Sequence, residues 1–209
     1  MFRKLMAAAA ALVVATSVVS AQTMPASPEG KTQAEIGGKY VKGARGGQTY
    51  EGGKWVEITY GRPILRGRDG IFGSGADYGK ELNGGAPVWR AGANATTRLR
   101  TQAALVIGGK TVPAGEYSVF IELKESGWTF VLSNWAAQKT YDPKNTAELW
   151  GSYNYTADKD VVRAPMTHTK NPMSIEQLTW SVANVTATGG ELVIMWGKDV
   201  ATVAFTVSK

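Results

Sequence analysis

The chain has 209 residues, of which 44% are hydrophobic and 19% charged, with no cysteine and one histidine. This length and apolar share favour one folded domain and exclude a fully disordered chain. The absence of cysteine excludes disulfide scaffolds, thiolate nucleophiles and zinc fingers, and one histidine cannot build a multi-histidine metal centre. We therefore expect neither a metal site nor a cofactor.

The N-terminus has the pattern of a secretory signal peptide. Arg3 and Lys4 precede an apolar run over residues 5–14, and Val19-Ser20-Ala21 places small residues at the −3 and −1 positions. The run is too short and too rich in alanine for a retained membrane anchor. The pattern predicts cleavage after Ala21, a periplasmic or extracellular mature chain and no membrane span in it. Cleavage lowers the net charge from +6 to +4, because 21 basic and 17 acidic residues remain, and this mild excess does not favour nucleic-acid binding.

Residues 22–54 are rich in Gly, Pro, Ser and Lys. This composition predicts a flexible lead-in with one edge strand over residues 32–36, followed by a single domain over residues 55–209. Of the 25 glycines, 16 lie between Gly37 and Gly92, which indicates loops and tight turns in that region.

From residue 55 onward, apolar and polar residues alternate in short segments, a pattern typical of strands. Gly108-Gly109 predicts a tight hairpin between segments 103–107 and 111 onward, and a Lys-Glu-Ser-Gly turn predicts a second hairpin. The only predicted helix is Pro143–Trp150. The fold class is therefore all-β, an antiparallel β-sandwich or jelly-roll-like barrel with long Gly/Arg-rich loops. Its other predicted strands are 55–60, 117–123, 128–133, 161–167, 175–183, 191–196 and 200–207, with further turns at Gly189-Gly190 and Gly197-Lys198.

Six of the nine arginines lie between positions 62 and 100, among several aromatic residues. Arginine binds carboxylate, phosphate or sulfate through a planar set of donors, and loops on a β scaffold often carry binding groups. The same arginines could instead hold long loops in place by pairing with aspartates and backbone carbonyls. If this region binds a ligand, we expect the arginines to bind an anionic group or hydroxyl groups of the ligand. The Trp89 ring would stack on the ligand, and the Asn94 amide would donate to it and accept from it. The candidate ligand-binding residues are Arg62, Arg68, Trp89, Arg90 and Asn94.

Three other features are expected to be structural. His168 has no evident partner, so we expect a surface or turn histidine. Asp158 and Asp160 are expected in a solvated turn. Trp128 and Trp180 alternate with other apolar residues, which indicates core positions rather than exposed sugar-stacking rings.

Seven short motifs follow one another along the chain: Tyr60-Gly61-Arg62-Pro63, Arg66-Gly67-Arg68, Ile71-Phe72-Gly73, Tyr78-Gly79-Lys80, Val88-Trp89-Arg90, Gly92-Ala93-Asn94 and Pro113-Ala114-Gly115-Glu116-Tyr117. As an ordered set they resemble the exported bacterial family known as domain of unknown function 2911 (DUF2911). The resemblance spans about residues 27–207 and implies export, a bacterial source and a β-rich domain, but no known activity. Two segments, Gly38–Lys54 and Glu81–Pro87, depart from the family pattern and look like insertions.

These observations favour a non-enzymatic binding module for an anionic or polyhydroxylated ligand, a small molecule or an envelope component. One alternative is a hydrolase acting on cell-envelope material, with Asp69 or Asp77 as acid or base beside arginines that stabilise developing negative charge. A purely structural domain is the other alternative. The sequence does not decide whether the protein is an enzyme.

Overall fold

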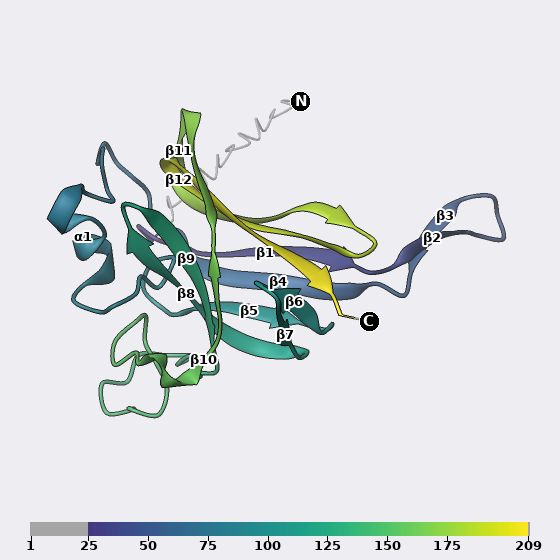
Figure 1. Ribbon diagram of the computed structural model, residues 1–209. Helices are drawn as coiled ribbons and strands as arrows, with labels where there is room; N and C mark the ends of the chain where they lie inside the picture. The colour runs from purple at the N-terminus through teal and green to yellow at the C-terminus, as the bar shows by residue number, and fades with distance from the viewer. Residues whose placement is uncertain (1–24, 209) are drawn as a thin grey trace, which may run out of the picture.

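The computed structural model describes residues 25–208 and shows an all-β fold built from antiparallel sheets (Figure 1). The main sheet has six strands in the order β1-β4-β5-β8-β9-β10, and a second sheet has four strands in the order β11-β12-β6-β7. The remaining pair, β2-β3, forms a separate hairpin. The strands of the main sheet are β1 (Glu29–Ile36), β4 (Lys54–Gly61), β5 (Thr97–Thr101), β8 (Gly115–Lys124), β9 (Gly127–Ser133) and β10 (Asp160–Pro165). Those of the other two sheets are β2 (Lys39–Lys42), β3 (Gln48–Glu51), β6 (Leu105–Ile107), β7 (Lys110–Val112), β11 (Thr167–Thr186) and β12 (Gly189–Val207).

The predicted all-β sandwich and both predicted hairpins are confirmed. Gly108 and Gly109 join β6 to β7 with φ values of 57° and 78°, a conformation that glycine adopts without steric cost. The segment 25–54, expected to be a flexible lead-in with one edge strand, contains β1, which pairs with β4 along its whole length, and the β2-β3 hairpin.

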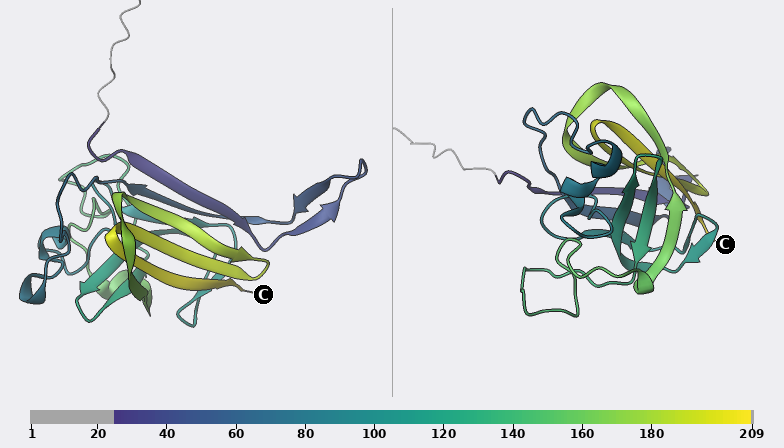
Figure 2. Two further views of the ribbon diagram at one scale, coloured as in Figure 1. Left: turned by 90° about the horizontal axis from the view of Figure 1, so that it is seen from above. Right: turned by 60° about the vertical axis from the view of Figure 1, so that its left-hand side comes forward.

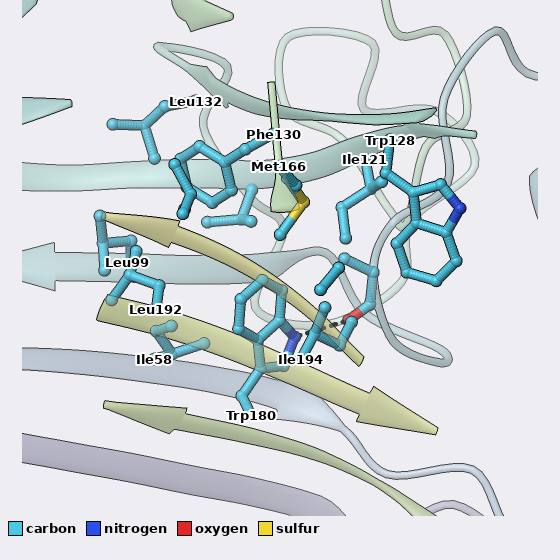
Figure 3. Packing of buried hydrophobic residues seen from close by; sticks show 14 of the residues in the cluster. Ile58, Leu99, Ile121, Trp128, Phe130, Leu132, Met166, Trp180, Leu192 and Ile194 are labelled. Atoms are coloured by element: carbon cyan, nitrogen blue, oxygen red, sulfur yellow. Dashed lines mark hydrogen bonds between the residues drawn. The ribbon is translucent and has the colours of Figure 1, made fainter. Parts of the chain in front are cut away.

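The core lies between the two large sheets. Trp180 and Ile194 from the four-stranded sheet face Ile58, Leu99 and Phe130 from the six-stranded sheet (Figure 3). All five side chains are at most 1% exposed. Burial of apolar residues on one face of each sheet follows from the period-two alternation in the sequence, so Trp128 and Trp180 are core residues as predicted.

A second, smaller core covers part of the outer face of the six-stranded sheet. Phe120 and Val131 point outward there and pack against Leu149 and Tyr155 from the long connection between β9 and β10. The predicted helix over Pro143–Trp150 is absent, because the backbone groups of this connection bond to distant partners. Leu149 N–H donates to the carbonyl of residue 136 at 2.8 Å, and the buried Gln138 amide donates to three carbonyls of the same connection.

Strands β11 and β12 are longer than the sequence indicated. Gly197 lies inside β12, where the β11-β12 register shifts in a bulge, so the predicted turn at Gly197-Lys198 was wrong. The predicted turn at Gly189-Gly190 was also displaced, because Ala187 and Thr188 make that turn.

The molecule has two contrasting ends. At one end lies the loop segment 62–96, which carries the short 3₁₀ helix η1 (Gly75–Asp77) and the helix α1 (Lys80–Asn83) (Figure 1). At the other end the β2-β3 hairpin projects away from the body, as both Figure 1 and the left view of Figure 2 show. Another 3₁₀ helix, η2 (Ala157–Lys159), precedes β10. Within residues 25–208 no helix is long and apolar enough to cross a membrane, and the predicted signal peptide lies outside the described residues.

Candidate functional site

The Gly- and Arg-rich loop 62–96 is tied to both large sheets by backbone hydrogen bonds. On the β11 side, Leu65 N–H donates to the carbonyl of Glu176 at 2.8 Å, and Leu178 N–H donates to the carbonyl of Pro63 at 2.9 Å. On the β8 side, Trp89 and Ile121 exchange two backbone bonds of 2.8 and 2.9 Å. The loop thus closes one end of the sandwich and is held in place as if it were an additional strand at each side.

A close approach explains one of its glycines. A Cβ atom on Gly61 would lie 1.9 Å from the carbonyl oxygen of Ala93, so only glycine allows β4 to pass this close to the end of the loop. Nearby, the buried Trp180 Nε1–H donates to the carbonyl of Ala91 at 2.9 Å, which ties the loop to β11.

Aromatic rings fill the space beneath the loop. Phe72 contacts Trp89, Trp128 and Trp196 with ring centroids 5.8, 4.7 and 6.2 Å apart, and the rings of Trp89 and Trp196 stack at 6.1 Å. Trp128 Nε1–H donates to the Tyr78 hydroxyl at 2.8 Å. This cluster gives the loop a rigid apolar base, a property that pre-organises any group the loop presents.

Burial raises the pKa of the Tyr78 phenol above its ordinary value of 10, although the hydrogen bond from Trp128 acts in the opposite direction. The phenol is therefore neutral at physiological pH. Since its oxygen accepts from the indole, its own O–H remains able to donate to a ligand.

A hollow of about 550 Å³ opens between this loop and the bulged part of β11 and β12. Its wall combines buried apolar side chains with charged ones of both signs. The lining residues on the loop are Leu65, Arg68, Asp69, Gly70, Ile71, Phe72, Gly73 and Tyr78, and those on β11 and β12 are Lys170, Ser174, Gly197, Lys198 and Asp199.

Arg68 is the best-fixed cation of this hollow. Its Nε–H donates to the carbonyl of Leu65 at 3.0 Å, one Nη2–H donates to the carbonyl of Ile64 at 2.8 Å, and its guanidinium lies 5.8 Å from the ring centre of Trp196. These contacts use two of its five N–H donors. Within the described part of the chain, no carboxylate lies within 4 Å of its guanidinium nitrogens.

Asp199 and His168 form a pair at the wall of the hollow. Asp199 Oδ1 contacts His168 Nε2 at 2.7 Å and accepts from Lys170 Nζ at 2.6 Å. The imidazole stacks on Trp128 with ring centres 4.3 Å apart. The expectation of a surface or turn histidine was therefore wrong. Asp199, which the sequence analysis did not single out, is the missing partner, and pairing between β11 and β12 brings the two residues together.

The structure does not gather the five sequence-predicted site residues around one hollow. Arg68 lines the hollow described above, whereas Asn94 lines a separate one of about 200 Å³. Arg90 Nη1 donates to the backbone carbonyl of Asn94 at 3.0 Å, so these two residues brace the same turn. Trp89 is 1% exposed and packed among other rings, and it offers no open face for stacking. Arg62 packs along Gly30 of β1, and its buried Nε has no hydrogen-bond partner in the described part of the chain.

The aspartates considered from the sequence have different surroundings. Asp69 lines the 550 Å³ hollow, while Asp77 lies on the exposed 3₁₀ helix and pairs with Lys80 at 3.0 Å. The Asp160 side chain is only 6% exposed and accepts from Tyr155 and Arg163, so the expectation of a solvated turn was wrong there. Asp158 is exposed, as expected.

Comparison with known proteins adds a family but no activity. No curated protein and no solved structure matches the chain. The family model described as "Protein of unknown function (DUF2911)" matches residues 44–205, which include the loop 62–96 and the bulged parts of β11 and β12 at the hollow. The chain thus belongs to the DUF2911 family.

Proposed function

We propose that this protein is a non-enzymatic binding module that takes a small anionic ligand with an apolar body in the 550 Å³ hollow. The observation that carries this proposal is Arg68, whose guanidinium is held by two backbone carbonyls and lies over Trp196, with no carboxylate partner among residues 25–208. A pre-positioned guanidinium with free N–H donors is suited to a carboxylate, sulfate or phosphate group.

The charges around Arg68 support an anion as the polar part of the ligand. Lys170 and Lys198 line the same hollow, and of the three cations only Lys170 has a carboxylate within 4 Å among residues 25–208. Asp69 and Asp199 offset part of this positive charge. Asp199 is already engaged by Lys170 and His168, so Arg68 and Lys198 remain to attract the ligand.

The apolar part of the wall supports a ligand with a hydrophobic body. Leu65, Ile71 and Phe72 line the hollow and are themselves at most 8% exposed. The volume falls within the range of about 300–1,000 Å³ that is usual for small-molecule pockets. Export through the N-terminal signal pattern is part of the same proposal, and it places the ligand in the periplasm or outside the cell.

A matched pair of probes tests the proposal. 2-Naphthoate and its uncharged analogue 2-naphthamide have the same ring body, and titration calorimetry measures their binding to the purified chain. We expect 2-naphthoate to bind at least about tenfold more tightly, a difference of about 1.4 kcal/mol. Arg68→Gln should weaken 2-naphthoate binding severalfold, and so should Lys198→Gln, a substitution at an exposed position.

Arg45→Gln is the control, because it removes one positive charge from the exposed turn between β2 and β3, at the opposite end of the molecule. Equal affinity for the two probes, no binding of either probe, or an equal loss in Arg45→Gln would each overturn the proposal.

A further inference from the structure

Among the described residues, the small second core covers the outer face of the six-stranded sheet over β8 and β9. Over β1, β4 and β5 the outward side chains are polar or charged, with the exception of Trp55. Val56 and Ile58 of β4 point into the core and are fully buried, so Trp55, Glu57 and Thr59 occupy the outer face. The strand register places Gln33 beside Glu57 on one side and Arg100 beside Glu57 on the other.

Three hollows follow one another along β4 on this face. The first, about 290 Å³, is lined by Trp55 and shares Glu57 and Arg100 with the second, of about 230 Å³. The second shares Thr59 and Arg98 with the third, of about 200 Å³, which reaches the loop at Asn94. We call the three together the β4 groove. From Trp55 to Gly61 it follows six residue steps of β4, or about 20 Å at 3.3 Å per residue.

Trp55 is an exposed indole at one end of the groove. Trp55 is 43% exposed, although apolar rings of this size are usually buried. Its backbone N–H donates to Gln102 Oε1 at 3.0 Å, and Gln102 N–H donates back to its carbonyl at 2.9 Å. These bonds fix both residues in place and leave the Gln102 amide NH₂ free to donate beside the ring. At the opposite end, the half-buried Trp150 lines the third hollow.

The groove alternates donors and acceptors, and its charges nearly cancel. Glu57 Oε2 pairs with Lys31 at 3.0 Å, which leaves the other oxygen of this carboxylate as an acceptor. Arg100 has no carboxylate within 4 Å among the described residues, so its N–H donors face the groove unpaired. The charged lining consists of the acidic residues Glu29, Glu57 and Glu116 and the basic residues Lys31, Arg98, Arg100 and Lys139.

This combination has one well-suited occupant. A long, shallow groove with an indole at each end and mixed donors and acceptors between them matches a chain of sugar rings, whose faces stack on aromatic residues and whose hydroxyls both donate and accept. Because the four basic and three acidic side chains nearly cancel, the groove has no strong field that would select a polyanion over an uncharged chain. We propose that the β4 groove binds a linear, uncharged polysaccharide. This site is separate from the hollow at Arg68, and neither proposal depends on the other.

Native gel electrophoresis in polysaccharide-containing gels tests the inference. The probes are three soluble uncharged chains, hydroxyethyl cellulose, xylan and glucomannan, with polygalacturonate as the charged comparison. We expect at least one uncharged chain to retard the protein, with an apparent dissociation constant that rises at least tenfold in Trp55→Ala and severalfold in Arg100→Gln. Both side chains are exposed, so these variants should fold, and unchanged thermal unfolding verifies this.

Tyr40→Ala is the matched control, because Tyr40 is 69% exposed on the β2-β3 hairpin, outside the groove. Arg68→Gln should retain polysaccharide binding, which separates this site from the anion site. The inference would be overturned if no uncharged chain retarded the protein, if only polygalacturonate did so, or if Trp55→Ala and Tyr40→Ala behaved alike.

Discussion

Asp199 of β12 contacts two residues of β11, His168 and Lys170. Substitutions that remove these contacts should lower the free energy of unfolding by amounts that depend on which contact is lost. The Asp199 side chain is 9% exposed and its Oδ1 contacts both His168 and Lys170. Lys170 is 68% exposed and can regain water when the carboxylate is lost, whereas His168 is 17% exposed and stacked on Trp128. Most of the cost of losing Asp199 should therefore come from the imidazole, which would remain without its partner.

The magnitudes follow from these exposures. A hydrogen bond to a charged group contributes about 1.5–3 kcal/mol, and an exposed ion pair contributes less than about 1 kcal/mol. We expect Asp199→Ala to lower the free energy of unfolding by about 2–4 kcal/mol. Asp199→Asn keeps an acceptor for His168 and should cost about 1–2 kcal/mol. Lys170→Gln removes only the exposed partner and should cost less than about 1 kcal/mol.

Urea denaturation at pH 7 measures all three variants through tryptophan fluorescence, for which Trp128 beside His168 is a local reporter. The linear extrapolation is applied with the slope checked for each variant, since a changed slope would indicate a changed unfolded state. A loss below about 0.5 kcal/mol in Asp199→Ala, or a loss in Lys170→Gln as large as in Asp199→Ala, would refute the assignment of the cost to the buried pair.

Three further predictions concern other regions. The hydrogen bond from Lys124, together with that from Arg163 and the positive charges of both residues, lowers the pKa of Glu122 despite the opposing effect of burial. This carboxylate therefore stabilises the fold above the ordinary glutamate pKa of about 4.3 and stops doing so as the pH falls through its lowered value. The stability difference between wild type and Glu122→Gln in urea should accordingly shrink from pH 6 to pH 3, and a constant difference would contradict this. Arg90→Ala removes the bond to the Asn94 carbonyl and should cost about 1 kcal/mol by the same denaturation assay, with no change at all contradicting a bracing role. Intact-mass measurement of protein from its native host should show Gln22 as the first residue, and full-length protein in the cytosol would count against export.

Local sequence was a good guide wherever a short-range pattern dictates the backbone. Alternation of apolar residues placed β8, β9 and their partners, and Gly108-Gly109 marked the β6-β7 turn, because these signals depend only on neighbouring residues. The same alternation could also have identified Trp55. With Val56 and Ile58 facing the core, the residue before them must point outward.

Other sequence signals misled because distant contacts compete with local preference. Pro143–Trp150 has a helix-start pattern, yet bonds to residues 136–138 and burial of Leu149 against the outer face of the sheet are incompatible with a helix there. Gly197 is a strong turn signal in isolation, but pairing with β11 on both sides of it extends β12 through that position as a bulge.

The candidate sites show the same difference between local sequence signals and long-range contacts. The fold class could be read from the sequence, as could the arginines and aromatic rings of the loop 62–96, because composition and period-two patterning are local properties. Which of these side chains share a hollow depends on the three-dimensional arrangement of the strands and the loop. His168 and Asp199 are 31 residues apart and meet through the register of a bulged strand pair, while Arg68 and Arg90, in one loop, are directed to separate places. Register and loop path are set by the sum of many long-range contacts, and a single sequence carries no direct record of that sum.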